Sequence, residues 1–558
     1  MSVVSLSACA QSPVVLPTSP VNVISNSAAS RQELTPQLLY QFLLGEIASQ
    51  RGELRLSAEA FSDLAVRTRD ARVAKRATEI AMFARNPTQA LKNARLWQSL
   101  EPGSAKALQT LSSLLVNSGR VAEAKPHLLT WIKTGKGGEV FMQLHGVMAR
   151  QKDKQAVFDL VADLAATYPS VPEARFSVAQ AAWHAGTGER ALAELDEAMR
   201  LKPDWASVPL FKAQILQQLR GDDAALAFFK DFLSTAPGDR EVRLAYAKQL
   251  ARSARFAESR AQFEILVREM PDNPENHLAI GLIAMQTNDL DGAEANMIRA
   301  LELGHPDEAG VRFHLGQLAE ARGRAEQALT WYQSVGPSRQ QLDAHLRAAV
   351  VMAKLGRTPQ ALEWLNGLTP SDDAGRIQVA QTEAQILREA RDYQGMIAAL
   401  TRALEKMPDA GDLLYDRAMA AEKINRLDML EADLRRLITL KPDSAHAYNA
   451  LGYTLADRTS RTKEAIELLQ KALELAPDDP FILDSMGWAL FKAKRYDEAV
   501  DFLRRAHVSR PDPEISAHLG EALWMKGEKE EAQRIWKGSL QSHPDNESLR
   551  ETTSRLMP

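Results

Sequence analysis

Residues 445–478 read AHAYNALGYTLADRTSRTKEAIELLQKALELAPD, and this stretch decides the fold. In its first half, Leu451 and Leu455 recur at the spacing of one helix face, and the small residue Gly452 lies beside them. A polar turn follows, and the run EAIELLQKALEL carries a second apolar face with the same helical spacing. Pro477 has no amide N–H and clashes with a preceding helical turn, so it ends the second helix. The stretch therefore predicts two amphipathic helices joined by a short turn.

The same pattern returns along the chain with a period of about 34 residues. Prolines close successive units at nearly constant intervals, and composition alone does not produce such regularity. These prolines are Pro169, Pro203, Pro237 and Pro271 in one run, and Pro408, Pro442, Pro477, Pro511 and Pro544 in another. The period indicates a stack of repeated helix pairs.

A small residue recurs in each predicted first helix. Glycine costs a helix about 1 kcal/mol relative to alanine, so its repeated use indicates a packing requirement. We expect it to let the two helices of a pair approach closely. The positions are Gly45, Thr78, Ser112, Gly146, Ala179, Ala213, Ala247, Gly281, Gly316, Ala349, Ala384, Ala418, Gly452, Gly487 and Gly520.

The second helices repeat a small residue followed, four positions later, by a large one. The small residues are Ala124, Ala191, Ala225, Ala293, Ala328, Ala361, Ala499 and Ala532. The large residues are Leu128, Leu195, Phe229, Met297, Tyr332, Leu365, Leu503 and Trp536. Together with the period and the closing proline, this pattern resembles the tetratricopeptide repeat over roughly residues 38–546. The resemblance implies an all-α solenoid, a superhelix of about fifteen helical hairpins.

Composition narrows the possible functions. The chain has 68 basic and 72 acidic residues and a net charge of −4, without a basic stripe, which argues against nucleic acid as a partner. No HExxH, GxSxG or GxxxxGK[ST] motif occurs, and the eleven histidines are scattered. We therefore expect no catalytic residues, no cofactor and no metal site, and hence no enzyme.

The N-terminal residues carry a second resemblance. Leu6-Ser7-Ala8-Cys9 is similar to the lipobox of bacterial lipoproteins, in which the cysteine receives a lipid, so Cys9 is the expected lipidation site. Only Met1 to Ser5 precede it, too few for a signal peptide, so we expect the true start to lie upstream. No Asp follows Cys9, which in this family implies the outer membrane, facing the periplasm. We predict three segments: a lipobox remnant and flexible tether (1–33), an N-terminal array (34–340) and a C-terminal array with a capping helix (341–558).

Aromatic and polar residues gather in the first helices of the last three hairpins. In the tetratricopeptide repeat, particular positions of the first helix face a concave wall, and aromatic rings beside polar groups are typical of binding hot spots. The resemblance therefore implies a protein-binding surface, although several of these rings could instead pack between hairpins. The residues are Asn449, Tyr453, Phe481, Asp484, Trp488, Phe491, Glu521 and Trp524.

Residues 447–500 resemble a narrower group, the tetratricopeptide-repeat lipoproteins of proteobacteria. One type binds a periplasmic carboxyl-terminal processing protease and helps deliver peptidoglycan hydrolases to it. The resemblance implies a non-catalytic, lipid-anchored scaffold that binds a protease and its substrates, and a membrane only through its lipid. Two alternatives stay open. One is a scaffold for another envelope complex, such as polysaccharide export or outer-membrane assembly, and the other is a cytosolic co-chaperone-like binder.

Overall fold

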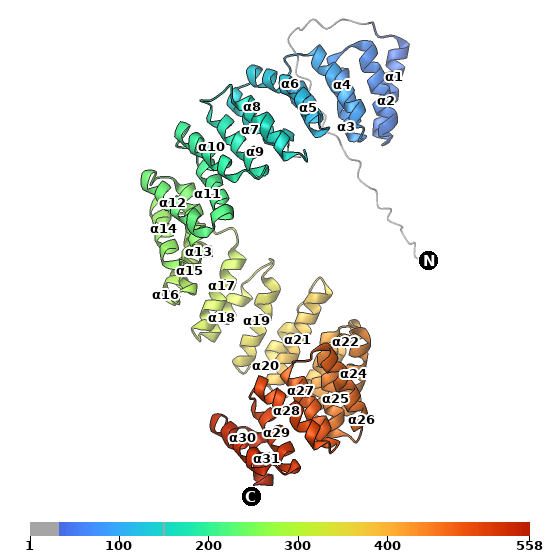
Figure 1. Cartoon of the computed structure of the whole chain (residues 1–558), viewed down its shortest axis with the longest axis vertical. Coiled ribbons are helices and arrows are strands. Elements are labelled where there is room, and N and C mark those ends of the chain that lie inside the picture. The colour runs from blue at the N-terminus through green and yellow to red at the C-terminus, as the bar shows by residue number, and fades with distance from the viewer. Residues whose placement is uncertain (1–32, 149–150, 558) are drawn as a thin grey trace, which may run out of the picture. The chain divides into compact units, whose positions relative to one another are not determined.

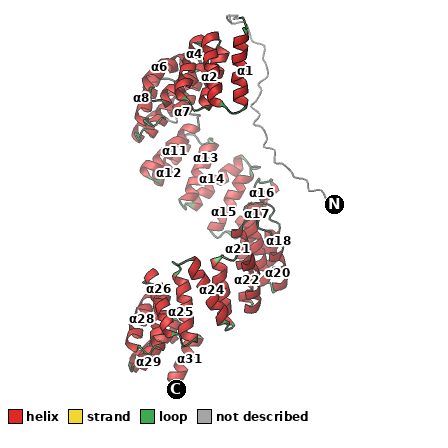
Figure 2. Ribbon diagram, turned by 90° about the vertical axis from the view of Figure 1, so that its right-hand side faces the viewer, coloured by secondary structure: helices red, strands yellow, loops and turns green. Residues whose placement is uncertain are grey.

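The computed structural model describes residues 33–148 and 151–557, and every regular element in these ranges is an α-helix (Figure 1, Figure 2). The predicted all-α fold is confirmed. The chain divides into two compact units, Met1–Leu266 and Val267–Pro558. The predicted division at residues 340 and 341 falls inside the second unit and stays a prediction.

The helices of the first unit are α1 (Pro36–Gln50), α2 (Leu54–Thr68), α3 (Ala71–Phe83), α4 (Pro87–Leu100), α5 (Ala105–Asn117), α6 (Val121–Thr134), α7 (Gly137–Met148), α8 (Lys154–Ala165), α9 (Pro172–His184), α10 (Gly188–Leu201), α11 (Ser207–Arg220), α12 (Asp222–Thr235) and α13 (Arg240–Arg252). Helix α14 (Phe256–Glu269) crosses the division.

The helices of the second unit are α15 (Pro274–Gln286), α16 (Leu290–Glu302), α17 (Glu308–Ala321), α18 (Ala325–Gln333), α19 (Gln341–Lys354), α20 (Thr358–Asn366), α21 (Asp373–Glu389), α22 (Tyr393–Lys406), α23 (Gly411–Lys423), α24 (Leu427–Leu440), α25 (Ala445–Arg458), α26 (Thr462–Leu475), α27 (Pro480–Lys492), α28 (Tyr496–Ser509), α29 (Pro513–Lys526), α30 (Lys529–Ser542) and α31 (Glu547–Leu556).

Odd-numbered helices from α1 to α29 are the first helices of hairpins, and even-numbered helices are the second. The predicted pair at 445–478 is α25 and α26, which ends two residues before Pro477. Within the first unit, α6, α8 and α10 lie on the outer side of the arc in Figure 1, and α5, α7 and α9 lie on the inner side. The first helices of that unit therefore form its inner wall.

The small residues of the first helices lie where the two helices of a hairpin touch. A β-carbon built at Gly452 would lie 2.7 Å from Leu469 Cγ, and one at Gly487 would lie 2.5 Å from Leu503 Cγ. Real β-carbons essentially never come this close. The contact between the two helices of a hairpin, which we call the seam, therefore requires glycine at these positions. Gly146 is an exception, because a β-carbon there meets no heavy atom within 4 Å and the residue is exposed. The prediction that Gly146 lies at a seam is therefore wrong; the early repeats follow the 34-residue pattern least closely.

The second helices follow the prediction throughout. All eight small residues and all eight large residues predicted there are buried. Where the first helix carries glycine, the large side chain fills the space beside it, as Met297 does beside Gly281 and Tyr332 beside Gly316. This alternation builds a series of buried clusters along each unit, in which a hairpin packs mainly on its neighbours.

Helix α31 packs against α29 after the last hairpin. Leu549 on α31 is fully buried, and the guanidinium of Arg555 donates two hydrogen bonds of 2.7 and 2.8 Å to the carboxylate of Glu521 on α29. The outward side of α31 is polar, with Glu551 and Ser554 exposed. An amphipathic helix thus covers the end of the array.

Candidate protein-binding surface

All eight residues predicted to bind proteins lie on three consecutive first helices, α25, α27 and α29. Helix α27 contacts both of the others. Two of these helices begin at strong local signals, since Pro480 and Pro513 are their first residues and Asp479 and Asp512 cap their free amide groups. These caps fix which side chains of α27 and α29 share a face. We call the eight residues the aromatic surface.

Trp488 is the centre of the aromatic surface, but its ring is largely covered. The residue is 8% exposed. Its indole stacks on the imidazole of His518, with centroids 4.1 Å apart, and on the ring of Phe491, with centroids 4.9 Å apart. Its indole N–H donates a 3.0 Å hydrogen bond to Asp457, and the ammonium of Lys492 lies 5.0 Å from its ring centroid. Trp488 therefore packs against its neighbours and leaves little of its ring free to contact a partner protein.

His518 joins Trp488 to Asp484. Its Nδ1 lies 3.0 Å from each carboxylate oxygen of Asp484, and both side chains are almost buried. Burial on its own lowers the pKa of a histidine, but the charge of Asp484 and its hydrogen bond outweigh this effect, so the pKa of His518 is raised. The pair therefore favours an imidazolium held between a carboxylate and an aromatic face.

Tyr453 and Asn449 lie on α25, on the other side of this cluster. The Tyr453 ring centroid is 6.4 Å from that of His518. Burial, followed by the negative charges of Asp457 and Asp484, raises the pKa of the Tyr453 hydroxyl, which therefore stays a neutral donor and acceptor. The side-chain oxygen of Asn449 is buried and accepts no hydrogen bond from any described residue.

Three rings of the aromatic surface are more accessible. Phe481 is 47% exposed, and Phe491 and Trp524 are half-buried. The guanidinium of Arg510 lies 5.0 Å from the Phe481 ring centroid, and the ammonium of Lys529 lies 5.0 Å from that of Trp524. These rings offer apolar area with a positive charge beside it, the composition expected of a hot spot.

The structure brings four of the eight residues into one cluster. Trp488, Asp484 and Tyr453 surround His518, and Phe491 stacks on Trp488. Asn449 lies one helical turn before Tyr453. The remaining residues are Phe481, at the start of α27, and Glu521 and Trp524, near the end of α29. Glu521 is buried and paired with Arg555, so its role in the structure is to hold α31.

Sequence reasoning missed His518, Asp457 and Lys492. The missing signal was the period itself, because Lys492 follows Asp457 by 35 residues, as Gly487 follows Gly452, and its ammonium lies 3.2 Å from the Asp457 carboxylate. Equivalent positions of successive hairpins are neighbours in space, and this rule would have identified that ion pair. His518 lies one position beyond the residue equivalent to Asp484, so the rule indicates the neighbourhood of that contact and not the contact itself.

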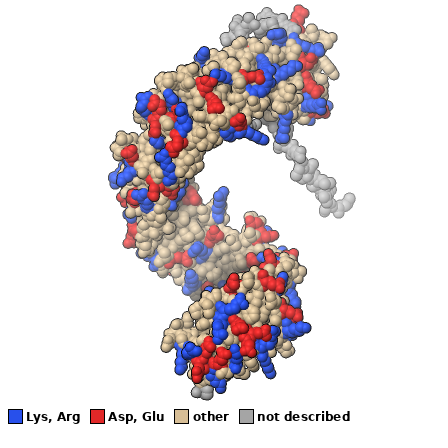
Figure 3. All heavy atoms as spheres, in the orientation of Figure 1, with Lys and Arg blue, Asp and Glu red and all other residues tan. Residues whose placement is uncertain are grey.

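Other expectations concern the chain as a whole. Cys9 lies outside the described residues. Over residues 33–148 and 151–557, no helix is long and apolar enough to cross a membrane. The same ranges hold no group of three or more His, Cys, Asp or Glu side chains that could bind a metal ion. On the face shown in Figure 3, basic and acidic side chains are interspersed over both units.

Comparisons with known proteins agree with this architecture. The tetratricopeptide repeat family matches residues 159–204, 278–341, 431–480 and 485–536. TPR repeat-containing protein PA4667 of Pseudomonas aeruginosa is 34% identical over 485 residues, which cover 87% of this chain and 82% of that protein. TPR repeat-containing protein YpiA of Bacillus subtilis is 20% identical, over 67% of this chain and 88% of that protein.

Solved structures with similar hairpins include a thermophilic TPR protein, TTC0263, of Thermus thermophilus. It is 20% identical, covers 34% of this chain and all of its own, and has a TM-score of 0.30. Tetratricopeptide repeats imply a scaffold for protein–protein interactions, and the relative in Pseudomonas aeruginosa extends the likeness over most of both chains. The chain therefore belongs to the tetratricopeptide-repeat proteins.

Proposed function

We propose that this protein is a non-catalytic adaptor, anchored to the outer membrane through Cys9 and facing the periplasm. Its guests are proteins: a carboxyl-terminal processing protease and the cell-wall hydrolases that this protease cleaves. The aromatic surface on α25, α27 and α29 holds one of them. The resemblance of residues 447–500 to tetratricopeptide lipoproteins and the lipobox-like Leu6–Cys9 support this proposal.

One observation carries the binding role. The accessible rings of Phe481, Phe491 and Trp524 lie on α27 and α29, two first helices that are held together by the stack of Trp488 on His518. Contact residues that are already held in place lose little conformational entropy when a partner binds. Accessible rings on firmly packed helices, with polar groups beside them, are therefore suited to capturing a protein segment.

The adaptor would act by raising local concentration. A scaffold that binds protease and substrate together makes their encounter effectively intramolecular, and the effective concentration reaches the millimolar range for short flexible connections. Lipid attachment would also confine all partners to one membrane surface. No group on the adaptor needs to take part in peptide hydrolysis.

A reconstituted protease assay tests the proposal. We expect the lipidated full-length protein to accelerate hydrolase cleavage by the processing protease and to form a complex with at least one of them. The double variant Phe481→Ala/Trp524→Ala should lose most of this acceleration and remain folded, because both side chains are partly exposed.

The matched control is Val508→Ala, which removes a 79% exposed apolar side chain from a second helix and should change nothing. If neither acceleration nor a complex is seen with the unmodified adaptor, the adaptor role is refuted. If the complex isolated from envelope extracts instead contains components of polysaccharide export or outer-membrane assembly, the alternative envelope scaffold takes its place.

A further inference from the structure

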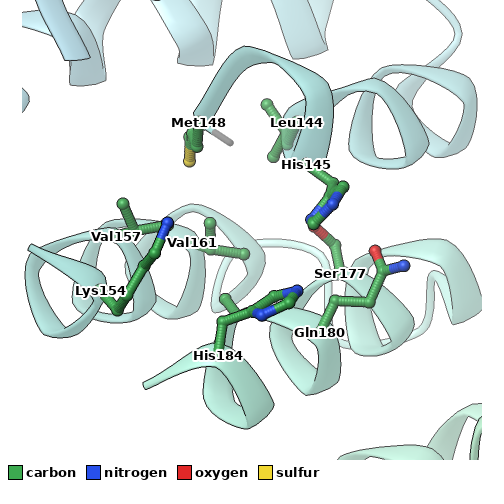
Figure 4. A pocket seen from close by; sticks show the side chains of 10 residues that line it. Leu144, His145, Met148, Lys154, Val157, Val161, Ser177, Gln180 and His184 are labelled. Atoms are coloured by element: carbon green, nitrogen blue, oxygen red, sulfur yellow. The ribbon is translucent and has the colours of Figure 1, made fainter. Parts of the chain in front are cut away.

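Two hollows lie on either side of α7 in the first unit. A groove of about 800 Å³ lies between α5 and α7 and extends to the end of α3 and the start of α4. A smaller cavity of about 180 Å³ lies on the other flank of α7, against α8 and α9 (Figure 4). The exposed residues Met142, Gln143, His145 and Gly146 of α7 run from one hollow to the other. We call the surface formed by the residues that line these two hollows the acid-free track.

The track carries no carboxylate. Twenty-five residues line the two hollows, and none is Asp or Glu. With 72 acidic residues among 558, a random set of that size would hold about three. Arg85 and Lys106 lie along the groove and form no ion pair within residues 33–148 and 151–557, and Lys154 lines the cavity. A negatively charged guest is therefore attracted and meets no repelling group in the lining.

Amide and hydroxyl side chains are among the residues that line the groove. Gln109 on α5 and Gln143 on α7 occupy equivalent positions 34 residues apart, and the hydrogen bond between their amides is long, at 3.5 Å. Asn117 donates a 3.2 Å hydrogen bond to Ser113, one turn earlier on α5. A side-chain amide has two donor hydrogens and an acceptor oxygen, so these residues retain unused capacity for the N–H and C=O groups of a peptide backbone.

The centre of the track is open. A β-carbon built at Gly146 would meet no heavy atom within 4 Å, so the last turn of α7 leaves room for a guest backbone. In the cavity beyond it, the imidazoles of His145 and His184 face each other with centroids 5.2 Å apart and planes 24° apart (Figure 4). Burial, and then the charge of His145, lowers the pKa of His184, so near neutral pH this ring offers an uncharged donor.

We infer that the acid-free track binds an extended, acidic peptide segment of a partner protein. Helices in contact lie about 8–10 Å apart, so the distance from α5 to α9 is about 20 Å. An extended chain covers that distance with about six residues, at roughly 3.3 Å each. Glutamate or aspartate side chains of the guest face Arg85 and Lys106, and its backbone bonds to Gln109 and Gln143. The inference rests on the proposed scaffold function, to which it adds a second guest of different chemistry from the one on the aromatic surface.

Fluorescence anisotropy with labelled octapeptides tests the inference on the full-length protein at pH 7.5 and low salt. The probes are (Glu-Ser)₄, (Gln-Ser)₄ and (Lys-Ser)₄, together with an oligonucleotide of eight thymidines. We expect the acidic peptide to bind at least tenfold more tightly than the neutral one, and to weaken severalfold when sodium chloride is raised to 0.3 M. Gly146→Trp fills the open centre, and Arg85→Glu/Lys106→Glu reverses the charge of the groove; each should weaken binding at least tenfold.

Two controls separate this result from misfolding and from the proposed function. Lys92→Glu makes the same charge change on the second helix α4, outside the track, and should leave binding unchanged. Phe481→Ala/Trp524→Ala should also bind the acidic peptide normally, so failure at the aromatic surface is distinguishable from failure here. The inference is overturned if no acidic peptide binds at millimolar concentration, if the basic peptide or the oligonucleotide binds more tightly, or if a correctly folded Gly146→Trp variant binds unchanged.

Discussion

The imidazole of His518 lies face to face with the indole of Trp488, with ring centroids 4.1 Å apart and planes at 21°. On its edge, the same imidazole faces the carboxylate of Asp484 at 3.0 Å. Three side chains from α27 and α29 thus form one contact in which stacking and charge act on the same ring. Because α27 also carries Phe481 and Phe491, the state of this contact determines how firmly the aromatic surface is held.

The His518–Asp484 pair should make the packing of α27 against α29 depend on pH. The pKa of His518 is raised in the folded protein, against the lowering effect of burial, because Asp484 favours the charged form. A raised pKa contributes stability that is fully present below the unfolded-state value, near 6.5, and is lost as the pH rises through the folded-state value. Hydrogen–deuterium exchange of peptides from α27 and α29, corrected for intrinsic rates, should therefore show more protection at pH 6 than at pH 9.

His518→Gln is the control for this effect, because glutamine keeps a polar side chain but does not titrate. The variant should show the same protection at both pH values. Asp484→Asn should also remove the extra protection at pH 6, because burial without the carboxylate lowers the pKa of His518 and the ring loses its proton. Equal pH dependence in all three proteins would contradict this account of the pair.

Glycine at the hairpin seams should be irreplaceable even by alanine. Gly487→Ala places a β-carbon 2.5 Å from Leu503 Cγ and 3.1 Å from the carbonyl oxygen of Ala499. Overpacking of this kind typically costs 1–3 kcal/mol, roughly, which exceeds the gain of about 1 kcal/mol from the better helix former. Thermal unfolding should show a clear loss of stability.

Gly146→Ala is the matched comparison, because its β-carbon would meet no heavy atom within 4 Å. Only the helix propensity changes there, so we expect unchanged or slightly higher stability, by up to about 1 kcal/mol. A stability loss at Gly146 equal to that at Gly487 would show that Gly146 lies at a seam after all.

The packing of α31 on the end of the array should depend on one ion pair, Arg555–Glu521. Arg555→Ala removes both hydrogen bonds to Glu521 and leaves a buried carboxylate without a partner. Since Arg555 itself is about half exposed, we expect a loss of roughly 1 kcal/mol, confined to α31 and α29. Amide exchange in peptides from α31 should accelerate severalfold, whereas Arg550→Ala, an exposed position on the same helix, should have little effect.

Cys9 should determine where the protein resides. If the lipid is attached at Cys9, expression of the full gene in a proteobacterial host should place the protein in the membrane fraction, and Cys9→Ala should release it. Mass spectrometry of the N-terminal peptide would identify the acyl group directly. A protein that fractionates identically with and without Cys9 would remove the anchor from the proposed function.

The hairpins could be predicted from the sequence because each one carries the same local pattern of residues. A helix face, a small seam residue such as Gly452 and a closing proline repeat often enough to exclude another fold. The arrangement of the aromatic surface could not be predicted so fully. The position of Trp488 in its helix is clear from the repeat, but the cover provided by His518 and Asp457 comes from neighbouring hairpins. The acid-free track was missed because it depends on which residue types are absent from the lining of two hollows, and the sequence does not show which side chains line them.

The ion pair between Asp457 and Lys492, in which the ammonium lies 3.2 Å from a carboxylate oxygen, also constrains how such a protein can evolve. The two residues hold the same place in consecutive copies of one ancestral unit, so a fresh duplication would set two aspartates, or two lysines, against each other. Like charges at that distance repel, and the favourable pair arises only after the copies have diverged. What the first helices α25, α27 and α29 recognise therefore depends on how adjacent copies differ. Replacing one copy by its neighbour would remove these differences and leave the stack of hairpins intact.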